Sequence, residues 1–114
     1  MTKRELIDYC LTYPSAFEDY PFGDVAAVIR HSGNKKTFAL IGYRNDRLYI
    51  NLKCEPMKAD FLRNAFEGVT PGWHMNKTHW NTVHLDRDVP EQELYDMIGH
   101  SYDLTKPKAG RLLK

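Results

Sequence analysis

The sequence lacks most of the features that mark specialised classes of protein. Its 114 residues include two cysteines, Cys10 and Cys54, which form no C-x-x-C pair and so indicate free thiols in a reducing compartment. No apolar run is long enough for a signal peptide or a membrane span. We therefore expect a cytoplasmic protein with no membrane partner.

Charge of one sign is not in excess either. The formal net charge is +1, from 16 Lys and Arg against 15 Asp and Glu. No field over the whole surface therefore draws the protein to nucleic acid or to a membrane. Any anion must be bound by a local patch.

Motifs for catalysis and metal binding are missing as well. The sequence has no G-x-S-x-G segment, no phosphate-binding glycine loop and no H-E-x-x-H pair. We expect no catalytic residue, no metal site and no cofactor. An enzyme that uses His74 or His79 as a general base remains an alternative, although no nucleophile can be identified for it.

What the sequence does contain is enough apolar residues for one core. Hydrophobic residues make up 42% of the chain and charged residues 27%, which is ordinary for a globular protein. The length fits one domain. We expect a single domain over residues 1–106, a basic tail over residues 107–114, and a monomer.

Two helices are predicted in the first two thirds of the chain. Thr2 and Glu5 form a capping box before the first helix, which should end near Thr12. Pro56 suits the first turn of the second helix, and Gly68 is a natural stop for it. The predicted apolar face of the second helix is Met57, Phe61, Leu62, Ala65 and Phe66.

Strands are predicted from apolar alternation and turn residues. A three-stranded antiparallel meander is expected over 25–30, 36–43 and 47–52, with turns at 32–34 and 45–46. Two further short strands are expected over 72–75 and 82–85. The aromatic-rich stretch 14–24 is expected to be an irregular connection.

A third helix is predicted after Asp88, which stands at capping-box spacing from Glu91. Its expected apolar face is Leu94, Met97, Ile98, Ser101 and Tyr102. The element order α-β-β-β-α-β-β-α predicts an α+β fold with an antiparallel sheet of about five strands and the helices packed on one face. The other face would then be open to a partner.

The strongest functional signal lies between Glu67 and Asp86, where no acidic residue occurs. A run that interleaves cations and indoles without acids suits an anion with flat rings attached, such as a nucleic acid. Lys77 can meet a phosphate, and Asn76 can bond a base edge. The candidate contacts of this segment are His74, Asn76, Lys77, His79 and Trp80.

Structural roles for the same segment stay open. Trp73 and Met75 would point to one face of a strand and suit the core, whereas Trp80 can anchor the connection. Asn76 can close a turn with its own side chain. The segment holds three histidines at five-residue spacing, but no cysteine accompanies them, so a zinc site is not expected.

The two predicted hairpin turns carry positive charge. Arg30, Lys35 and Lys36 flank the first turn, and Arg44 and Arg47 flank the second. Two cationic tips could act as paired wings that grip the backbone of a duplex. Alternatively, the charges protect exposed hairpins from pairing with other chains.

Four pieces of the sequence together resemble the MmcQ/YjbR-like family, and the resemblance spans about Thr2 to Leu104. The pieces are Tyr20-Pro21-Phe22-Gly23, Leu52-Lys53 with Glu55-Pro56, Pro71 to Trp80, and Ser101-Tyr102. The most specific part is His-x-Asn-Lys-x-His-Trp at 74–80. The resemblance implies a fold similar to the bacterial frataxin homologue, and DNA binding through a double-wing surface.

Iron binding of the frataxin type is not implied. That activity uses a dense acidic ridge, whereas the first helix here has only Glu5 and Asp8, mixed with Lys3 and Arg4. A shared fold does not import an activity.

The sequence thus predicts a non-enzymatic binding domain that contacts DNA phosphates weakly and in a salt-sensitive way. The alternative is a small-molecule or protein interaction module with a pocket at His74, Asn76 and Lys77. A concavity at this segment would favour the alternative, and a flat positive surface would favour DNA.

Overall fold

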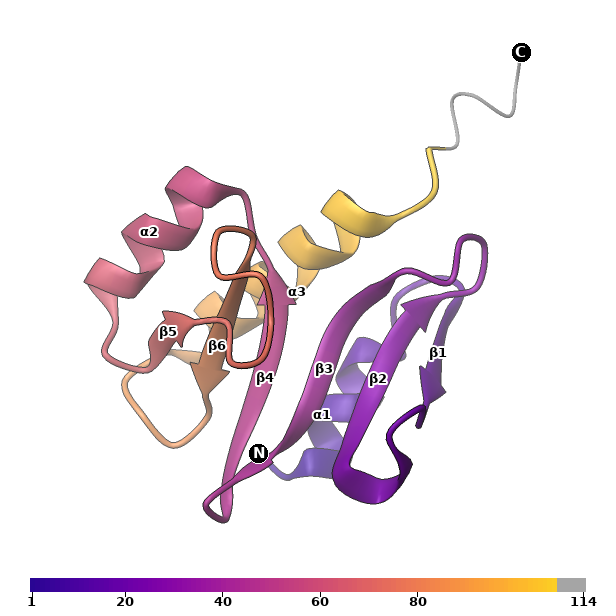
Figure 1. Cartoon of the computed structure of the whole chain (residues 1–114), viewed down its shortest axis with the longest axis horizontal. Coiled ribbons are helices and arrows are strands. Elements are labelled where there is room, and N and C mark those ends of the chain that lie inside the picture. The colour runs from indigo at the N-terminus through magenta and orange to yellow at the C-terminus, as the bar shows by residue number, and fades with distance from the viewer. Residues whose placement is uncertain (109–114) are drawn as a thin grey trace.

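The computed structural model describes residues 1–108 of the chain. These residues form helices and a six-stranded antiparallel sheet in the order β1-β2-β3-β4-β6-β5 (Figure 1). The elements are α1 (Lys3–Cys10), β1 (Ala16–Asp19), the 3-10 turn η1 (Gly23–Val25), β2 (Ala26–His31), β3 (Thr37–Arg44), β4 (Arg47–Lys53), α2 (Pro56–Ala65), β5 (Val69–Pro71), β6 (Trp80–His84) and α3 (Glu91–Thr105). The α+β class is confirmed, with six strands where about five were predicted. The end of the predicted basic tail, 109–114, lies outside the described residues.

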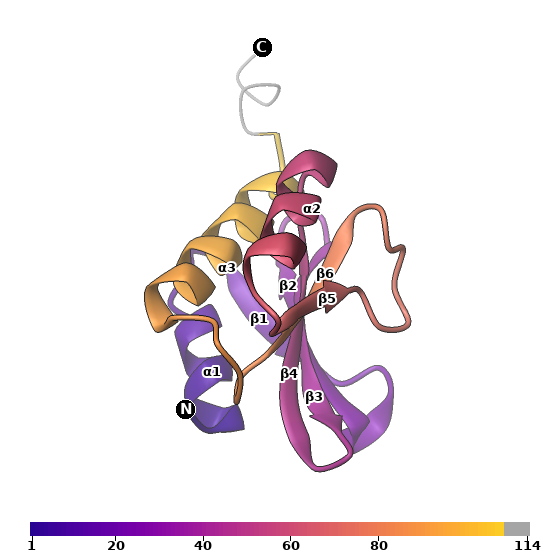
Figure 2. The same ribbon diagram turned by 90° about the vertical axis from the view of Figure 1, so that its left-hand side faces the viewer.

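The helices lie on one face of the sheet and enclose the core. Figure 2 shows α1 and α3 on one side and the β5–β6 loop on the other, while α2 packs beside β5 and β6. The largest fully buried apolar side chains on this face are Leu6, Ile29, Phe38, Ile41, Ile50, Leu52 and Ile98. Their removal from water supplies most of the stability of the fold. Within residues 1–108 no helix is long and apolar enough to cross a membrane.

Several local signals produce the structure that they predict. The backbone N–H of Glu5 donates to Thr2 Oγ1 (3.1 Å) and the N–H of Thr2 donates to Glu5 Oε1 (2.8 Å), which completes the capping box. Asn45 and Asp46 adopt positive φ in the β3–β4 turn. In the β2–β3 turn, which was predicted at 32–34, the residue with positive φ is Lys35.

One strand was missed. Residues 16–19 lie within the stretch predicted to be irregular, yet they pair with β2 as the edge strand β1. The guanidinium of Arg4 in α1 donates two hydrogen bonds to Glu18 (3.0 and 2.8 Å), which ties β1 to the helix layer. This pairing depends on partners far along the chain, so a local pattern does not predict it.

The predicted apolar face of α2 is wrong in part. Met57 and Phe61 are 81% and 67% exposed. The side of α2 that packs against the sheet comprises Ala59, Leu62, Arg63 and Phe66. The helix is turned this way because Arg63 points inward and donates to Asn81 Oδ1 (2.7 Å).

The predicted strand over Gly72–Met75 is also wrong, because β5 ends at Pro71. The N–H of Gly72 still donates to the Trp80 carbonyl (2.9 Å), but His74 then takes a left-handed φ of 60° and turns the chain away. Residues 72–79 are therefore a loop rather than a strand.

The predicted cap of α3 is wrong as well. The Asp88 carboxylate accepts from the backbone N–H groups of Glu67 and Gly68 (2.9 and 2.7 Å), and α3 begins after Pro90 without a side-chain cap. Gly68 is needed for close approach rather than as a helix stop, because a Cβ there would lie 2.8 Å from the Cβ of Arg87.

Candidate ligand-binding cleft on the open sheet face

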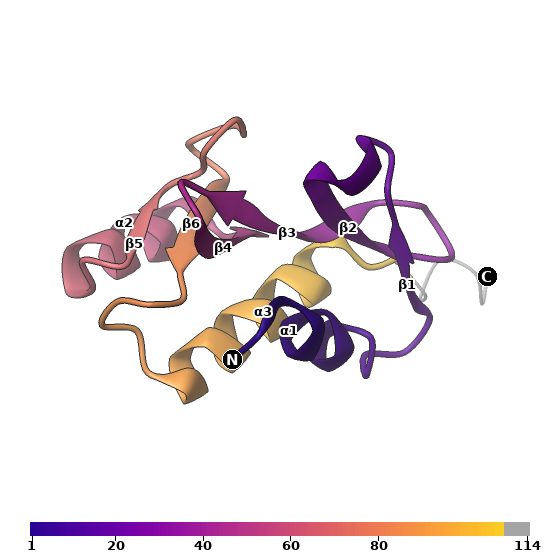
Figure 3. The ribbon, with the colours of Figure 1, turned by 90° about the horizontal axis from the view of Figure 1, so that it is seen from below.

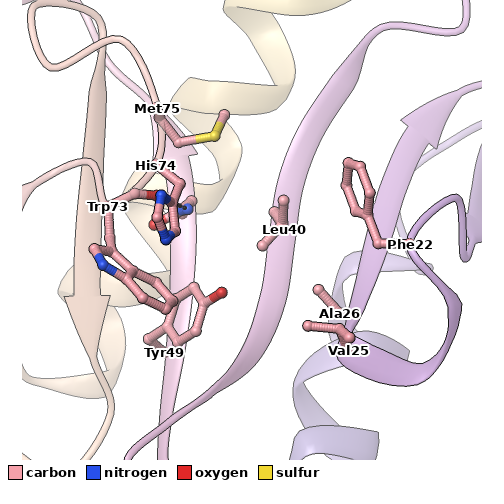
Figure 4. Close-up of a pocket in the computed structure, with 9 residues that line it drawn as sticks. Phe22, Val25, Ala26, Leu40, Tyr49, Trp73, His74 and Met75 are labelled. Atoms are coloured by element: carbon pink, nitrogen blue, oxygen red, sulfur yellow. Dashed lines mark hydrogen bonds between the residues drawn. The ribbon is translucent and has the colours of Figure 1, made fainter.

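Two loops rise from the sheet face opposite α1 and α3 (Figure 3): residues 20–25 before β2 and residues 72–79 between β5 and β6. Between them lies a cavity of about 390 Å³, which we call the open-face cleft. Its lining residues are Phe22, Val25, Ala26, Leu40, Tyr49, Asn51, Trp73, His74 and Met75. Figure 4 shows Trp73, His74 and Met75 on one side, Phe22 on the other, and Leu40 between them.

The floor of the cleft is formed by alternate residues of the central strands. Leu40 pairs with Asn51, and Gly42 pairs with Tyr49, so these side chains share the open face. A Cβ at Gly42 would lie 3.2 Å from the Tyr49 hydroxyl, so glycine leaves room for the ring. Burial raises the pKa of Tyr49, although the charge of Arg44 opposes this, so the phenol is neutral at physiological pH.

The loop 72–79 is held in shape by its own polar side chains. Lys77 Nζ donates to the carbonyls of Gly72 (3.1 Å) and Met75 (3.5 Å). The Asn76 side chain accepts from the backbone N–H groups two and three residues ahead (2.9 and 3.3 Å), which is the geometry of an Asx turn. In the structure the ammonium of Lys77 and the amide of Asn76 therefore bond to the backbone of their own loop.

A third polar side chain reaches the loop from α2. The guanidinium of Arg63 donates to the carbonyl of Lys77, to the carbonyl of Trp80 (3.2 Å) and to Asn81 Oδ1 (2.7 Å). The loop is therefore tied to the helix layer as well as to itself.

The loop is also hydrogen-bonded to the centre of the sheet. The N–H of Trp73 donates to Thr82 Oγ1 (2.8 Å), and Asn51 Nδ2 donates to the Trp73 carbonyl (3.1 Å). Thr82 Oγ1 in turn donates to Asn51 Oδ1 (2.5 Å), which closes the triangle. Because each of these polar atoms is satisfied within the protein, this wall is fixed in the absence of a ligand.

The indole of Trp73 is the centre of this wall. Its ring packs edge to face against Tyr49 (centroids 5.5 Å apart) and lies 4.3 Å from the ring of His74. The guanidinium carbon of Arg44 lies 4.5 Å from the indole centroid, within cation–π range. Trp73 is therefore positioned by its neighbours while one part of it remains open to the cleft.

The opposite wall is shorter and more exposed. The Tyr20 hydroxyl donates to Glu18 (2.5 Å), which anchors the start of the loop. Gly23 has a φ of 70°, where a side chain would be strained. Phe22 and Val25 remain 62% and 73% exposed. These exposed apolar side chains form one rim of the open-face cleft.

The lining of the open-face cleft contains few titratable side chains. Among its lining residues only Tyr49 and His74 are titratable, and no nucleophile stands beside a base. Within residues 1–108 no group of three or more metal-ligating side chains comes together. A largely apolar concavity of this volume, with a few polar groups, is typical of small-molecule sites.

Comparison with known proteins decides the family, because residues 11–104 match the model of YjbR. The chain belongs to the YjbR family. The predicted resemblance is thereby confirmed. Relatives include YyaQ of Bacillus subtilis (strain 168), which is 35% identical over an alignment of 118 residues. The alignment covers 93% of this chain and 99% of YyaQ. YjbR of Escherichia coli (strain K12) is 33% identical over 102 residues, which cover 90% and 85%. Both are described as uncharacterized.

Solved structures show the same fold. A crystal structure of a Pseudomonas syringae protein has a TM-score of 0.81 at 33% identity and covers 93% of this chain and 100% of that one. A Deinococcus radiodurans protein has a TM-score of 0.85 at 33% identity, with 98% and 86% covered. Neither description states a ligand or a reaction.

In this YjbR-family chain the predicted contact residues of the 74–80 segment lie in different surroundings. His74 lines the open-face cleft, whereas Asn76 and Lys77 are used within the loop. His79 is exposed, and its carbonyl accepts from the Cys54 N–H (2.8 Å). Trp80 is half-buried in β6 and pairs with Lys53. Of the predicted pocket at His74, Asn76 and Lys77, only the first residue faces the cavity.

The cations predicted at the two hairpin turns also differ in their surroundings. Arg30 Nε forms a salt bridge with Asp19 Oδ2 (2.9 Å), and Arg47 Nε forms one with Asp86 Oδ2 (2.7 Å). Lys35 lies 5.1 Å from the centroid of the Phe17 ring, and Lys36 is exposed. Arg44 stacks on Trp73 as described above.

The two cationic turns lie at opposite ends of β3. The β2–β3 turn precedes Thr37 and the β3–β4 turn follows Arg44, so about 24 Å of strand separates them. Figure 1 shows the turns at opposite edges of the molecule. A duplex held by both would have to lie along the whole strand.

The other half of the cleft lining was not predicted from the sequence. Phe22, Val25, Leu40, Tyr49 and Asn51 line the open-face cleft but were not candidates. A signal for two of them was available, because Tyr49 and Asn51 alternate with the apolar positions of the third predicted strand. An aromatic and an amide on the solvent side of a central strand indicate a surface that is covered or used.

Proposed function

We propose that this chain is a cytoplasmic, non-enzymatic binding module whose ligand lies in the open-face cleft. The observation that carries the proposal is the cleft itself, a fixed concavity with exposed apolar side chains on its rim. Burial of that rim by a ligand would be favourable, since each Å² of apolar surface removed from water contributes about 25 cal/mol.

The position of the family-typical segments supports the proposal. Tyr20–Gly23 and Pro71–Trp80, which carry the resemblance to the YjbR family, are about 50 residues apart in the sequence. In the fold they supply the two walls of one cleft. A purely structural role for both segments would not require them to face each other across an open cavity.

A matched pair of phenylalanines tests the proposal. Phe22 on the cleft wall and Phe61 on α2 are exposed to nearly the same extent, so truncation of either should cost similar stability. Titration calorimetry with naphthylacetamide, a neutral ring-sized probe, should show saturable binding to the wild type. Phe22→Ala should weaken it roughly fivefold to thirtyfold, as expected for about 1–2 kcal/mol of lost contact.

Phe61→Ala should leave the affinity unchanged. Absence of saturable binding to the wild type, or equal loss in the two variants, would remove the open-face cleft as the site. Val25→Glu and Met57→Glu provide a second matched pair, because a carboxylate at the cleft rim would lose hydration when an apolar ring covers it and should weaken binding.

DNA binding is the second candidate, and the observation that favours it is the exposed cation pair at the β2–β3 turn, Lys35 and Lys36. Anisotropy titrations with duplex and single-stranded DNA at several salt concentrations test it, because each phosphate contact adds to the salt dependence. Lys36→Ala together with Arg44→Ala should flatten that dependence. Lys77→Ala is a poorer test, since Lys77 closes the loop. No binding at low salt would exclude this candidate.

A further inference from the structure

The side chains on the open sheet face change from apolar to cationic along the strands. Beyond the floor of the open-face cleft, toward the β3–β4 turn, the next cross-strand pair on this face is Arg44 with Arg47. From β6, His84 is the partner of Tyr49 on the same face. Arg44, Arg47 and His84 line a second cavity of about 170 Å³ together with Asn45. The face therefore runs from an apolar centre to a cationic end.

Trp73 and Arg44 join the two cavities. The indole of Trp73 lines the open-face cleft, and Arg44 lines the second cavity. The guanidinium carbon of Arg44 lies 4.5 Å from the centroid of that indole. A molecule that lies against Trp73 and extends past it toward the β3–β4 turn would meet Arg44.

The positively charged side chains at the cationic end of the open face differ in whether they already have a partner within the protein. Arg47 donates to Asp86 (2.7 Å), and this hydrogen bond lowers the pKa of Asp86, so the pair stays ionised and largely neutral overall. Burial lowers the pKa of His84, and the neighbouring arginines lower it further, so this imidazole is uncharged near neutral pH. The ion pairs within residues 1–108 involve Arg4, Arg30, Arg47, Arg87 and Lys106.

Arg44 is thus the lining cation with no carboxylate partner in the described part of the chain. The cation–π contact of Arg44 with the Trp73 indole does not use the guanidinium N–H groups as hydrogen-bond donors to a carboxylate or carbonyl. Those groups form the fixed fork that matches the two oxygens of a carboxylate. The cavity end therefore offers one unneutralised positive charge of suitable geometry.

We infer that the ligand of the open-face cleft is an amphipathic carboxylic acid. Its apolar, ring-sized body lies between Trp73 and Phe22, and its carboxylate accepts hydrogen bonds from Arg44. The inference rests on the proposed function, because it names the class of ligand that the same cleft takes. Charge complementarity favours the acid, because a carboxylate can accept hydrogen bonds from the exposed Arg44 guanidinium, whereas a neutral apolar molecule gains nothing from that charge.

Two probes of the same shape test the inference separately from the proposed function. Naphthylacetate and naphthylacetamide differ in charge but present the same ring. The wild type should bind the acid about tenfold more tightly than the amide at low salt, the size expected for a charge-assisted hydrogen bond. Added salt should reduce this preference and leave the affinity for the amide unchanged.

Three variants test whether Arg44 is the positive charge that binds the carboxylate. Arg44→Gln should bring the affinities for acid and amide within about twofold of each other, whereas Arg44→Lys should retain part of the preference because the charge remains. Lys36→Gln removes a charge at the far end of β3 and should change neither affinity. If packing of Arg44 on Trp73 were its only role, Arg44→Lys and Arg44→Gln would weaken acid and amide equally, and the inference would be wrong.

The remaining outcomes are also decisive. Equal affinity of the wild type for acid and amide would overturn the inference and leave the proposed function standing. A preference for the acid that persists in Arg44→Gln would place the carboxylate elsewhere. Failure of both probes to bind would overturn the inference and the proposed function together.

Discussion

The two faces of the sheet are built by different kinds of interaction. The face beneath α1 and α3 is packed with branched and aromatic side chains, such as Ile41 and Ile50, that are fully buried. The open face has a hydrogen-bonded triangle of Asn51, Thr82 and Trp73, with apolar side chains left at the surface. Because residues 40 and 41 are neighbours on the same strand, side chains that face the core and side chains that face the cleft occupy alternate positions.

The largest expected effect compares these two neighbours. Ile41→Ala should lower the free energy of unfolding by about 3–4 kcal/mol, because it leaves a cavity in the closed core. Leu40→Ala should cost about 1–2 kcal/mol, since its side chain is only half-buried. Urea denaturation measures both costs.

Binding of naphthylacetamide should show the reverse order. Leu40→Ala removes part of the cleft floor and should weaken binding, whereas Ile41→Ala should bind normally under conditions where it is folded. Equal effects of the two substitutions on binding would show that the faces are not separate in function.

The next effect concerns the hydrogen-bonded triangle. Asn51→Ala should cost about 2–3 kcal/mol, because the Trp73 carbonyl and the Thr82 hydroxyl lose their partner in a buried position. Asn64→Ala serves as a control, since its bond to the Asp60 carbonyl is exposed. A change in the near-ultraviolet circular dichroism of Asn51→Ala, but not of Asn64→Ala, would indicate that the tryptophan wall has moved.

The two walls should respond differently to added methyl groups. Gly72→Ala places a Cβ 2.8 Å from that of Trp80 and should cost about 2 kcal/mol as the pairing is pushed apart. Gly23→Ala meets no neighbour within 4 Å and should cost about 1 kcal/mol for its left-handed backbone alone. Thermal unfolding ranks the two variants, and the reverse order would contradict the assignment of close approach to Gly72.

The smallest effect is on the pH dependence of stability. Burial lowers the pKa of His31 on the covered face and of His84 on the open face. The unfolded chain therefore binds more protons than the folded one below about pH 6.5, the pKa of an ordinary histidine. Stability should be fully present above that pH and should decline as the pH falls.

Denaturation at several pH values between about 5 and about 7 measures this slope, because that range includes the ordinary histidine pKa of about 6.5. His31→Gln and His84→Gln should each flatten it. A slope unchanged in both buried variants would mean that other groups carry the proton linkage.

Much of the covered face could be predicted from sequence. Period-2 alternation at Leu48, Ile50 and Leu52 identified β4, and the Asn45-Asp46 turn fixed its register against β3. The capping box at Thr2 is equally local. These features succeed because each depends on residues a few positions apart and on one buried side.

The site was predicted only at its edge, because its geometry is set by distant pairings. Lys77 looked like a free cation, but its ammonium closes the loop onto Gly72. Asp88 looked like a helix cap, but it binds the N–H groups that precede β5. Apolar spacing on α2 could not show that Arg63 turns inward. In each case the polar side chain hydrogen-bonds to a partner that the local sequence pattern does not identify.

The most direct test of the open-face cleft is a titration of the labelled protein with naphthylacetamide, followed by amide and indole chemical shifts in NMR. The account predicts that the largest saturable changes occur at the Trp73 indole N–H and at the amides of Phe22, Leu40 and Tyr49. Met57 and Phe61 on α2 should be unaffected. Saturable changes centred on α2, or none at all, would contradict it.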